Sequence, residues 1–120
     1  MADGQPADDR AAAVALIDRL RAEYRQGLPD RLAELRAALA AARSDPAGLP
    51  EAHRVAHRLA GTAGSYGCHG FGEACGQIED ALAGALKGAD PWARIDEAFK
   101  AAVEGANPAA VEASPVAGSR

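Results

Sequence analysis

Residues 49–72 read LPEAHRVAHRLAGTAGSYGCHGFG, a stretch in which apolar residues recur at helical spacing. Steps of three and four place these positions on one helix face: Val55, Leu59, Ala63 and Tyr66, with Thr62 beside them. Pro50 suits the first helical position, where its missing N–H is harmless. The run Gly67-Cys68-His69-Gly70 interrupts the pattern. We therefore expect a helix from about Pro50 to Tyr66.

Two more helices are predicted on the C-terminal side. The first runs from about Phe71 to Lys87, with inward positions at Phe71, Ala74 or Cys75, Ile78, Leu82 and Leu86. Gly88-Ala89-Asp90 forms a turn in which Asp90 caps the last helix and Pro91 takes its first position. The core stripe of that last helix comprises Trp92, Ile95, Phe99 and Val103.

On the N-terminal side the helical pattern extends from Ala11 to Arg43, before a turn at residues 44–48. One face carries the large apolar residues: Val14, Ile17, Leu20, Tyr24, Leu28, Leu32, Leu35 and Leu39. An interior Pro usually kinks or breaks a helix, so Pro29 leaves either one kinked helix or two joined helices. The phase does not reset at Pro29, which favours the kinked helix.

Short connections between long helices favour antiparallel neighbours. The expected fold is all-α: an up-down antiparallel four-helix bundle with an additional N-terminal helical segment. Ala supplies 32 residues, and small side chains suit closely packed helices. We expect the domain to span 10–105, between a flexible N-terminus at 1–9 and a disordered C-terminal tail at 106–120.

Composition excludes several classes of protein. The chain has 13 Lys and Arg against 17 Asp and Glu, a net charge of −4, which argues against nucleic-acid binding. No stretch approaches the roughly 20 apolar residues of a membrane span, and MADGQPADDR lacks a signal-peptide pattern. We expect a soluble, cytoplasmic monomer. Cys68 and Cys75 cannot form a disulfide framework and are expected to pack as small apolar residues.

His57 is the candidate reactive residue. At 100° per residue it lies about 200° from Val55 and Leu59, so it points away from the core. Gly61 and Gly64 lie on its face, and each interior Gly costs about 1 kcal/mol relative to Ala. Close packing of a neighbouring helix also favours such small residues, but this face of the helix is opposite the apolar stripe. The alternative is a bare patch where a partner approaches His57.

These residues resemble the histidine-containing phosphotransfer (HPt) domain family. The matching positions are His57, Leu59, Gly61, Thr62, Ala63, Gly67, Cys75 and Glu79, within a helical pattern covering residues 10 to 105. The resemblance implies that His57 accepts a phosphoryl group from a receiver-domain aspartate and passes it to another receiver in a multistep two-component phosphorelay. It implies a carrier without kinase activity of its own, with Mg²⁺ on the receiver and no cofactor on this chain.

The family commonly has Lys three residues after the histidine, where this chain has Ala60. Arg54 and Arg58 are the available cations, and helical phase favours Arg54. Glu79, on the next helix, is expected to orient the second ring nitrogen of His57, unless it is an ordinary surface carboxylate. His53, Ala60, Gly61 and Gly64 are the expected docking positions for the receiver.

Two rival functions stay open at this point. His53 and His57 have the i, i+4 spacing of a metal-binding pair, with His69 near the helix end, but no carboxylate of matching phase is evident. The loss of Lys at Ala60 is also compatible with a non-catalytic helical adaptor that has lost phosphotransfer. The sequence does not identify the partner kinase or receivers, nor the direction of phosphoryl flow.

Overall fold

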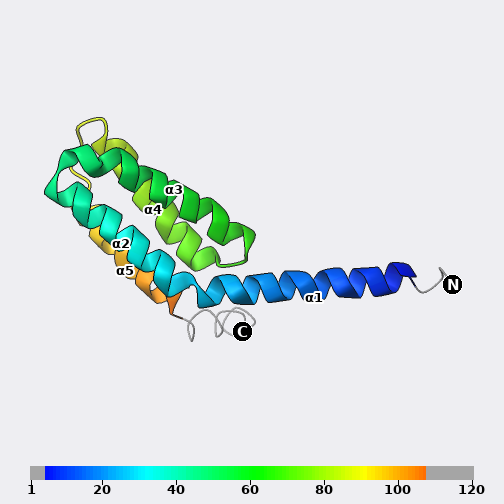
Figure 1. The fold of residues 1–120 in the computed structure, drawn as a ribbon. Coiled ribbons are helices and arrows are strands. Elements are labelled where there is room, and N and C mark those ends of the chain that lie inside the picture. The colour runs from blue at the N-terminus through cyan, green and yellow to red at the C-terminus, as the bar shows by residue number, and fades with distance from the viewer. Residues whose placement is uncertain (1–4, 108–120) are drawn as a thin grey trace, which may run out of the picture.

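The computed structural model describes residues 5–107, and the side chains from residue 8 onward. This part of the chain contains five α-helices and no strand (Figure 1). The helices are α1 (Gln5–Gln26), α2 (Leu28–Ser44), α3 (Leu49–Ser65), α4 (His69–Ala85) and α5 (Trp92–Ala106), with a short 3₁₀ turn, η2 (Pro46–Gly48), before α3.

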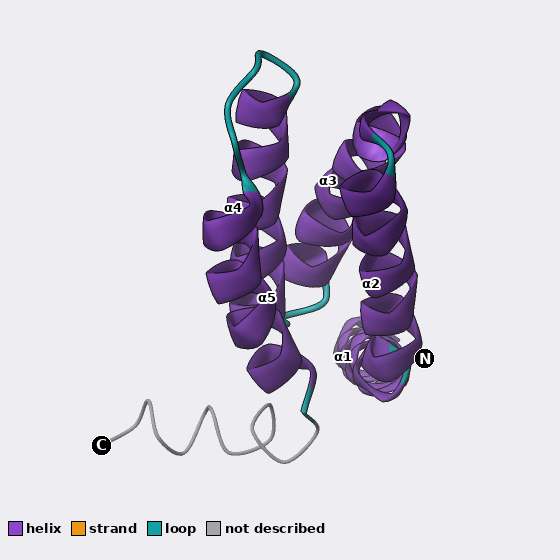
Figure 2. Cartoon of the chain, turned by 90° about the vertical axis from the view of Figure 1, so that its left-hand side faces the viewer, coloured by secondary structure: helices purple, strands orange, loops and turns teal. Residues whose placement is uncertain are grey.

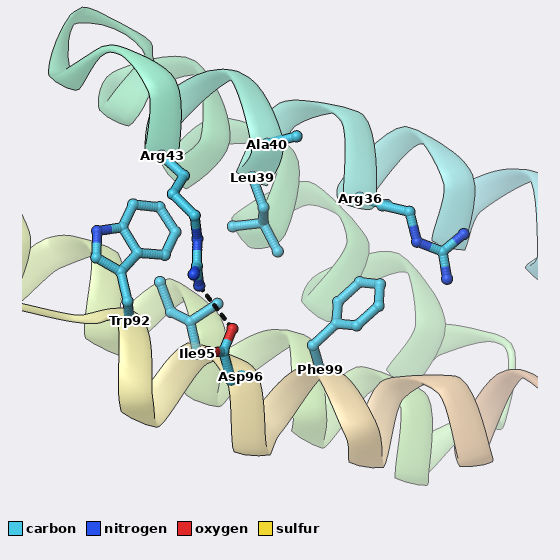
Figure 3. A pocket seen from close by; sticks show the side chains of 8 residues that line it. All are labelled: Arg36, Leu39, Ala40, Arg43, Trp92, Ile95, Asp96 and Phe99. Atoms are coloured by element: carbon cyan, nitrogen blue, oxygen red, sulfur yellow. Dashed lines mark hydrogen bonds and ion pairs between the residues drawn. The ribbon is translucent and has the colours of Figure 1, made fainter.

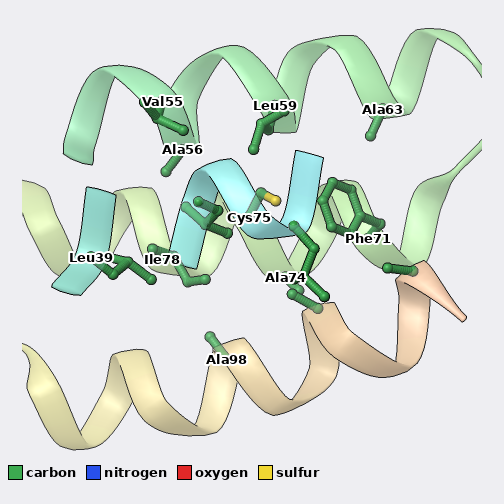
Figure 4. Close-up of a cluster of buried hydrophobic side chains, with 14 of the residues drawn as sticks. Leu39, Val55, Ala56, Leu59, Ala63, Phe71, Ala74, Cys75, Ile78 and Ala98 are labelled. Carbon is green, nitrogen blue, oxygen red and sulfur yellow. The ribbon is translucent and has the colours of Figure 1, made fainter. Parts of the chain in front are cut away.

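Helices α2 to α5 form an up-down bundle in which each helix packs against the next and α5 closes against α2 (Figures 1 and 2). This confirms the all-α bundle with an additional N-terminal helix. The interior is built from Leu, Ile, Phe and many Ala side chains (Figure 4). Its largest fully buried members are Leu28, Leu35, Val55, Leu59, Phe71, Cys75, Ile78, Leu82 and Ile95.

Helix α1 leaves the bundle instead of continuing α2, so the prediction of one kinked helix was wrong (Figure 1). Gly27 ends α1 by donating to the carbonyls of Glu23 and Tyr24, and Pro29 lies in the first turn of α2. Proline has no N–H to continue the helical ladder, so the chain changes direction here.

The predicted core face of α1 is therefore largely outside the core. Val14 is 52% exposed, Ile17 45% and Leu20 39%. Only Tyr24, near the end of α1, is buried, where its ring stacks on Tyr66 with centroids 4.7 Å apart. Periodicity identified the apolar face of this helix, but the bundle covers only its last turn.

Two glycines end the central helices in the same way. Gly67 has φ +80° and Gly88 has φ +102°, in the left-handed region that favours glycine. At Gly67, the N–H groups of Gly67 and Cys68 donate to the carbonyls of Gly64 and Ala63, as in a Schellman cap. These caps turn the chain from α3 into α4 and from α4 toward α5.

Several boundary and burial predictions need correction. Leu86 follows α4 as its C-cap and is 49% exposed, because the helix ends before the residue can turn inward. Val103 is 40% exposed, since Ala102 and Ala106 take the inward positions of α5. Phe99 and Trp92 are half-buried.

The predicted domain limits also differ from the structure. Residues 5–9 belong to α1, and Ala106 is a buried residue of α5 rather than the start of a tail. Helix α5 begins at Trp92, one residue later than expected, although Asp90 still accepts a hydrogen bond from the Trp92 N–H. Residues 1–4 and 108–120, on which the remaining terminal predictions fall, lie outside the described residues.

The seam between α2 and α5 is an apolar hollow of about 220 Å³ on the bundle surface (Figure 3). Arg43 spans it, with its guanidinium 4.5 Å from the ring centroid of Trp92 and 2.6 Å from Asp96. Arg36 lies over the ring of Phe99 in the same way. These arginines cover one side of the Phe99 and Trp92 rings, and both rings are half-buried.

Candidate functional site

His57 stands on the outer face of α3, near the middle of the helix. Its side chain is 72% exposed, whereas Val55 and Leu59 on either side are buried. The helical phase that anchors these two neighbours in the core therefore turns the imidazole outward. The expected exposure of His57 is confirmed, and its ring is open to a large partner.

Glu79 approaches His57 from α4. Its Oε2 lies 2.6 Å from His57 Nδ1, and its side chain is only 23% exposed. With the neutral ring in the Nδ1–H tautomer, Nδ1 donates to this carboxylate and the lone pair of Nε2 stays free. The sequence expectation that Glu79 meets the second ring nitrogen of His57 agrees with this geometry.

His53 lies one turn before His57 and faces the same carboxylate. Its Nε2 is 4.0 Å from Glu79 Oε2, and its side chain is 32% exposed. The rings of the two histidines are nearly parallel, with centroids 6.4 Å apart and an interplanar angle of 10°. His53 is therefore partly covered beside Glu79 rather than standing free on the surface.

Next to His57 the surface forms a shallow hollow of about 580 Å³, called here the His57 hollow. Its lining residues all come from α3 and its C-cap: His57, Arg58, Gly61, Thr62, Ser65 and Tyr66. A Cβ built at Gly61 or Gly64 would meet no atom of another described element within 4 Å. The close-packing explanation of these two glycines therefore fails, because none of the described helices rests on them.

A glycine that does serve helix packing beside the site is Gly72 on α4. A Cβ there would stand 3.3 Å from the carbonyl oxygen of Ala60, the Cβ of Ala63 and the backbone N of Gly64. Such distances are tighter than ordinary van der Waals contact, so α4 approaches α3 closely only because Gly72 has no side chain. Sequence analysis missed this role, although glycine inside a helix was a visible signal.

The two arginines are arranged differently from the expectation. Arg54 turns away from the hollow and binds Glu51, with Nη2–Oε2 at 2.6 Å and Nε–Oε1 at 3.0 Å. Arg58 lines the His57 hollow and forms an ion pair with Glu34 of α2. Helical phase alone favoured Arg54, but its side chain binds Glu51, which lies three residues earlier and one turn nearer the start of α3.

Thr62, Ser65 and Tyr66 are site-lining residues that sequence analysis did not assign to the site. Thr62 Oγ1 and Ser65 Oγ each donate to the backbone carbonyl four residues earlier, those of Arg58 and Gly61. Their hydroxyl groups are thus turned along the helix, and the hollow keeps a low, nearly smooth floor. Tyr66 was placed on the core face, whereas it is half-buried at the edge of the hollow.

The two thiols lie apart from this chemistry. Cys68 and Cys75 are free and buried, as expected of small apolar residues. Burial raises the pKa of Cys75 to about 12, so its thiol stays protonated at neutral pH. Cys75 is one turn before Glu79 on α4, where it fills the core beneath the site.

Within residues 5–107, no group of three or more His, Cys, Asp or Glu side chains is placed to hold a metal ion. Among the same residues, no helix combines the length and the apolar character that crossing a bilayer requires.

Comparison with protein families decides the classification. The family model described as Hpt domain matches residues 19–108, three quarters of the chain. The chain belongs to the Hpt domain family. No curated protein and no solved structure matches it in the same comparisons. The matched region begins inside α1 and covers the whole bundle, including His57 and Glu79.

Membership of the Hpt family gives this protein a phosphotransfer role in two-component signalling. Hpt domains are phosphocarriers rather than catalysts, and they interact with receiver domains in phosphorelays. In this Hpt domain the exposed histidine, its carboxylate partner and the bare helix face lie side by side.

Proposed function

We propose that this Hpt domain carries a phosphoryl group on Nε2 of His57, taking it from a receiver aspartate and passing it to a second receiver. The observation that carries the proposal is the pairing of an exposed imidazole with Glu79 through Nδ1. In the neutral ring this bond places the proton on Nδ1 and leaves the lone pair of Nε2 free, as a nucleophile requires.

In the proposed step, Nε2 attacks the phosphorus of the receiver's acyl phosphate. The N–P bond forms while the P–O bond to the aspartate breaks, and the aspartate carboxylate leaves with the bonding electron pair. The ring keeps its proton on Nδ1 and becomes positively charged, a charge that Glu79 balances at 2.6 Å. Transfer to the second receiver reverses these bond changes.

The receiver is expected to supply the acidic pocket and Mg²⁺, which offset the charge of the transferring phosphoryl group. This chain contributes Arg58, whose guanidinium lines the His57 hollow while bound to Glu34. If Arg58 releases Glu34 and binds a phosphoryl oxygen, it takes over part of the function of the Lys that the family commonly has at the position of Ala60. Arg54 is bound to Glu51 and does not line the hollow, so Arg54→Ala is the control for Arg58→Ala.

The test is incubation with a ³²P-labelled receiver domain, followed by chemical characterisation of the label. Acid-labile, base-stable label is expected in the wild type and is expected to vanish in His57→Gln. His53→Gln and His69→Gln should retain it, since His57 is the only expected phosphorylated residue. Failure of every candidate receiver to label the wild type, while receiver binding persists, would support the non-catalytic adaptor instead.

A further inference from the structure

The carboxylate that holds His57 has a second histidine within reach. Oε2 of Glu79 lies 2.6 Å from His57 Nδ1 and 4.0 Å from His53 Nε2. The two imidazoles are stacked one turn apart on α3, whereas Glu79 reaches both from α4. Oε2 would have to move about 1 Å toward His53 Nε2 to come within hydrogen-bond distance, a movement that a rotation within the Glu79 side chain supplies.

We propose that His53 is a positioning residue that competes with His57 for Glu79 and so sets how firmly the nucleophile is held. The inference rests on the proposed function of His57. When Glu79 binds His57, the Nδ1–H tautomer is favoured and Nε2 is free to attack. When Glu79 turns to His53, His57 loses the partner that fixes its tautomer and its ring orientation.

The charge of His53 decides this competition. Histidine changes its charge between about pH 5 and pH 8, and a protonated imidazole attracts a carboxylate more strongly than a neutral one. Protonation of His53 therefore draws Glu79 away from a neutral His57.

The other charged side chains nearby are paired with one another or exposed to solvent. On α3, Glu51 and Arg54 bind one another, and Arg58 binds Glu34 of α2. On α4, Asp80 follows Glu79 and is exposed. Within the described part of the chain, His53 therefore faces Glu79 across the helix pair and His57 along its own helix.

The test fixes the charge at position 53 and observes His57 directly. His53→Lys supplies a permanent cation, and His53→Leu removes the competitor, while His69→Leu changes a histidine outside this cluster. At pH 8, ¹⁵N NMR of the unphosphorylated protein is expected to show the Nδ1–H tautomer of His57 in the wild type and in His53→Leu. In His53→Lys that tautomer should lose population, and phosphoryl transfer should slow by about tenfold.

Three outcomes overturn the proposal: an unchanged His57 tautomer in His53→Lys, a faster transfer in that variant, or loss of the Nδ1–H tautomer in His53→Leu. The last would make His53 a support for Glu79 rather than a competitor. The NMR measurement needs no receiver, so a wild-type protein that accepts no phosphoryl group refutes the proposed function without deciding the competition.

Discussion

Oε2 of Glu79 lies 2.6 Å from Nδ1 of His57, across the contact between α4 and α3. The bond joins the most exposed ring of the site to a carboxylate that is only 23% exposed. Because Glu79 is anchored on a helix whose neighbouring residues fill the core, it can hold the imidazole in one orientation.

Removal of this carboxylate should slow the carrier without unfolding it. Glu79→Ala is expected to reduce phosphoryl transfer to His57 by about 10- to 100-fold, by analogy with the loss of a hydrogen-bond partner from a metal-ligating histidine. Glu79→Gln keeps an oxygen acceptor and should retain more activity. Rapid-quench kinetics with a labelled receiver would measure both variants. Glu73→Ala, an exposed change on the same helix, is the control, and an equal loss there would contradict the assignment.

Gly64 and Gly72 should respond in opposite ways to a side chain. A side chain at Gly64 enters open space, and Gly64→Gln raises helix propensity, so thermal stability should stay level or rise. Transfer from a receiver should fall sharply, because the added side chain holds the receiver away from His57. Transfer from phosphoramidate should suffer much less, since no protein must dock. Gly72→Ala is expected to lose about 1–3 kcal/mol of unfolding free energy, because α3 and α4 must move apart. Unfolding of Gly64→Gln would show that Gly64 serves packing.

Ala60→Lys should strengthen phosphoryl transfer. The substitution places a cation three residues after His57, on the neighbouring turn, where it can meet the transferring phosphoryl group. We expect a faster transfer, by up to about tenfold, corresponding to roughly 1.4 kcal/mol of transition-state stabilisation. The transfer rate would be compared with that of Ala37→Lys, which adds the same charge at an exposed position on α2. Equal effects of both lysines would indicate general charge attraction.

Tyr24→Phe should stabilise the junction of α1 with the bundle. The Tyr24 hydroxyl is buried and has no hydrogen-bond partner among residues 8–107, and burial raises the pKa of this hydroxyl. Removing an unsatisfied buried hydroxyl is expected to raise the unfolding free energy by about 1 kcal/mol. Tyr24→Ala should instead lose about 3–5 kcal/mol, since it removes the ring between Tyr66 and Arg31. Urea denaturation of the two variants checks both signs.

Cys75 should make the fold sensitive to alkali. Its pKa is raised to about 12 in the folded state, from 9.0 in the unfolded chain, so its contribution to stability is complete below pH 9. As pH rises from 9 toward 12, the thiol ionises in the unfolded chain but stays protonated in the folded protein. The unfolding free energy therefore falls by up to about 4 kcal/mol. Cys75→Ala should start less stable but show a shallower decline between pH 8 and pH 11. An equal slope in both proteins would rule out this source.

Most of the bundle followed from apolar spacing, because a helix that packs on one side shows its packed face in the sequence. Leu35, Leu59 and Ile78 are buried on the predicted faces. The same spacing misled on α1, where Val14 and Ile17 form an apolar stripe that the bundle leaves uncovered. Periodicity identifies a face but not the element that covers it, and an uninterrupted phase did not reveal the change of direction at Gly27.

The site was predictable where it depends on one helix and less so where two helices meet. The outward position of His57 follows from its phase relative to Val55 and Leu59. The approach of Glu79 was expected only through the family resemblance, since residues 22 positions apart share no spacing rule. The choice between Arg54 and Arg58 depended on the carboxylates that each side chain finds, Glu51 and Glu34, which phase does not specify.

In the bundle, neighbours in space are largely neighbours in the chain, since α2, α3, α4 and α5 pack in the order in which they are synthesised. Most contacts therefore close short loops, and the entropy lost before each contact forms is small. Helical domains with this topology fold in about microseconds to milliseconds. A phosphocarrier domain built this way regains its shape quickly after any transient opening, so a group that it carries spends little time on an unstructured chain.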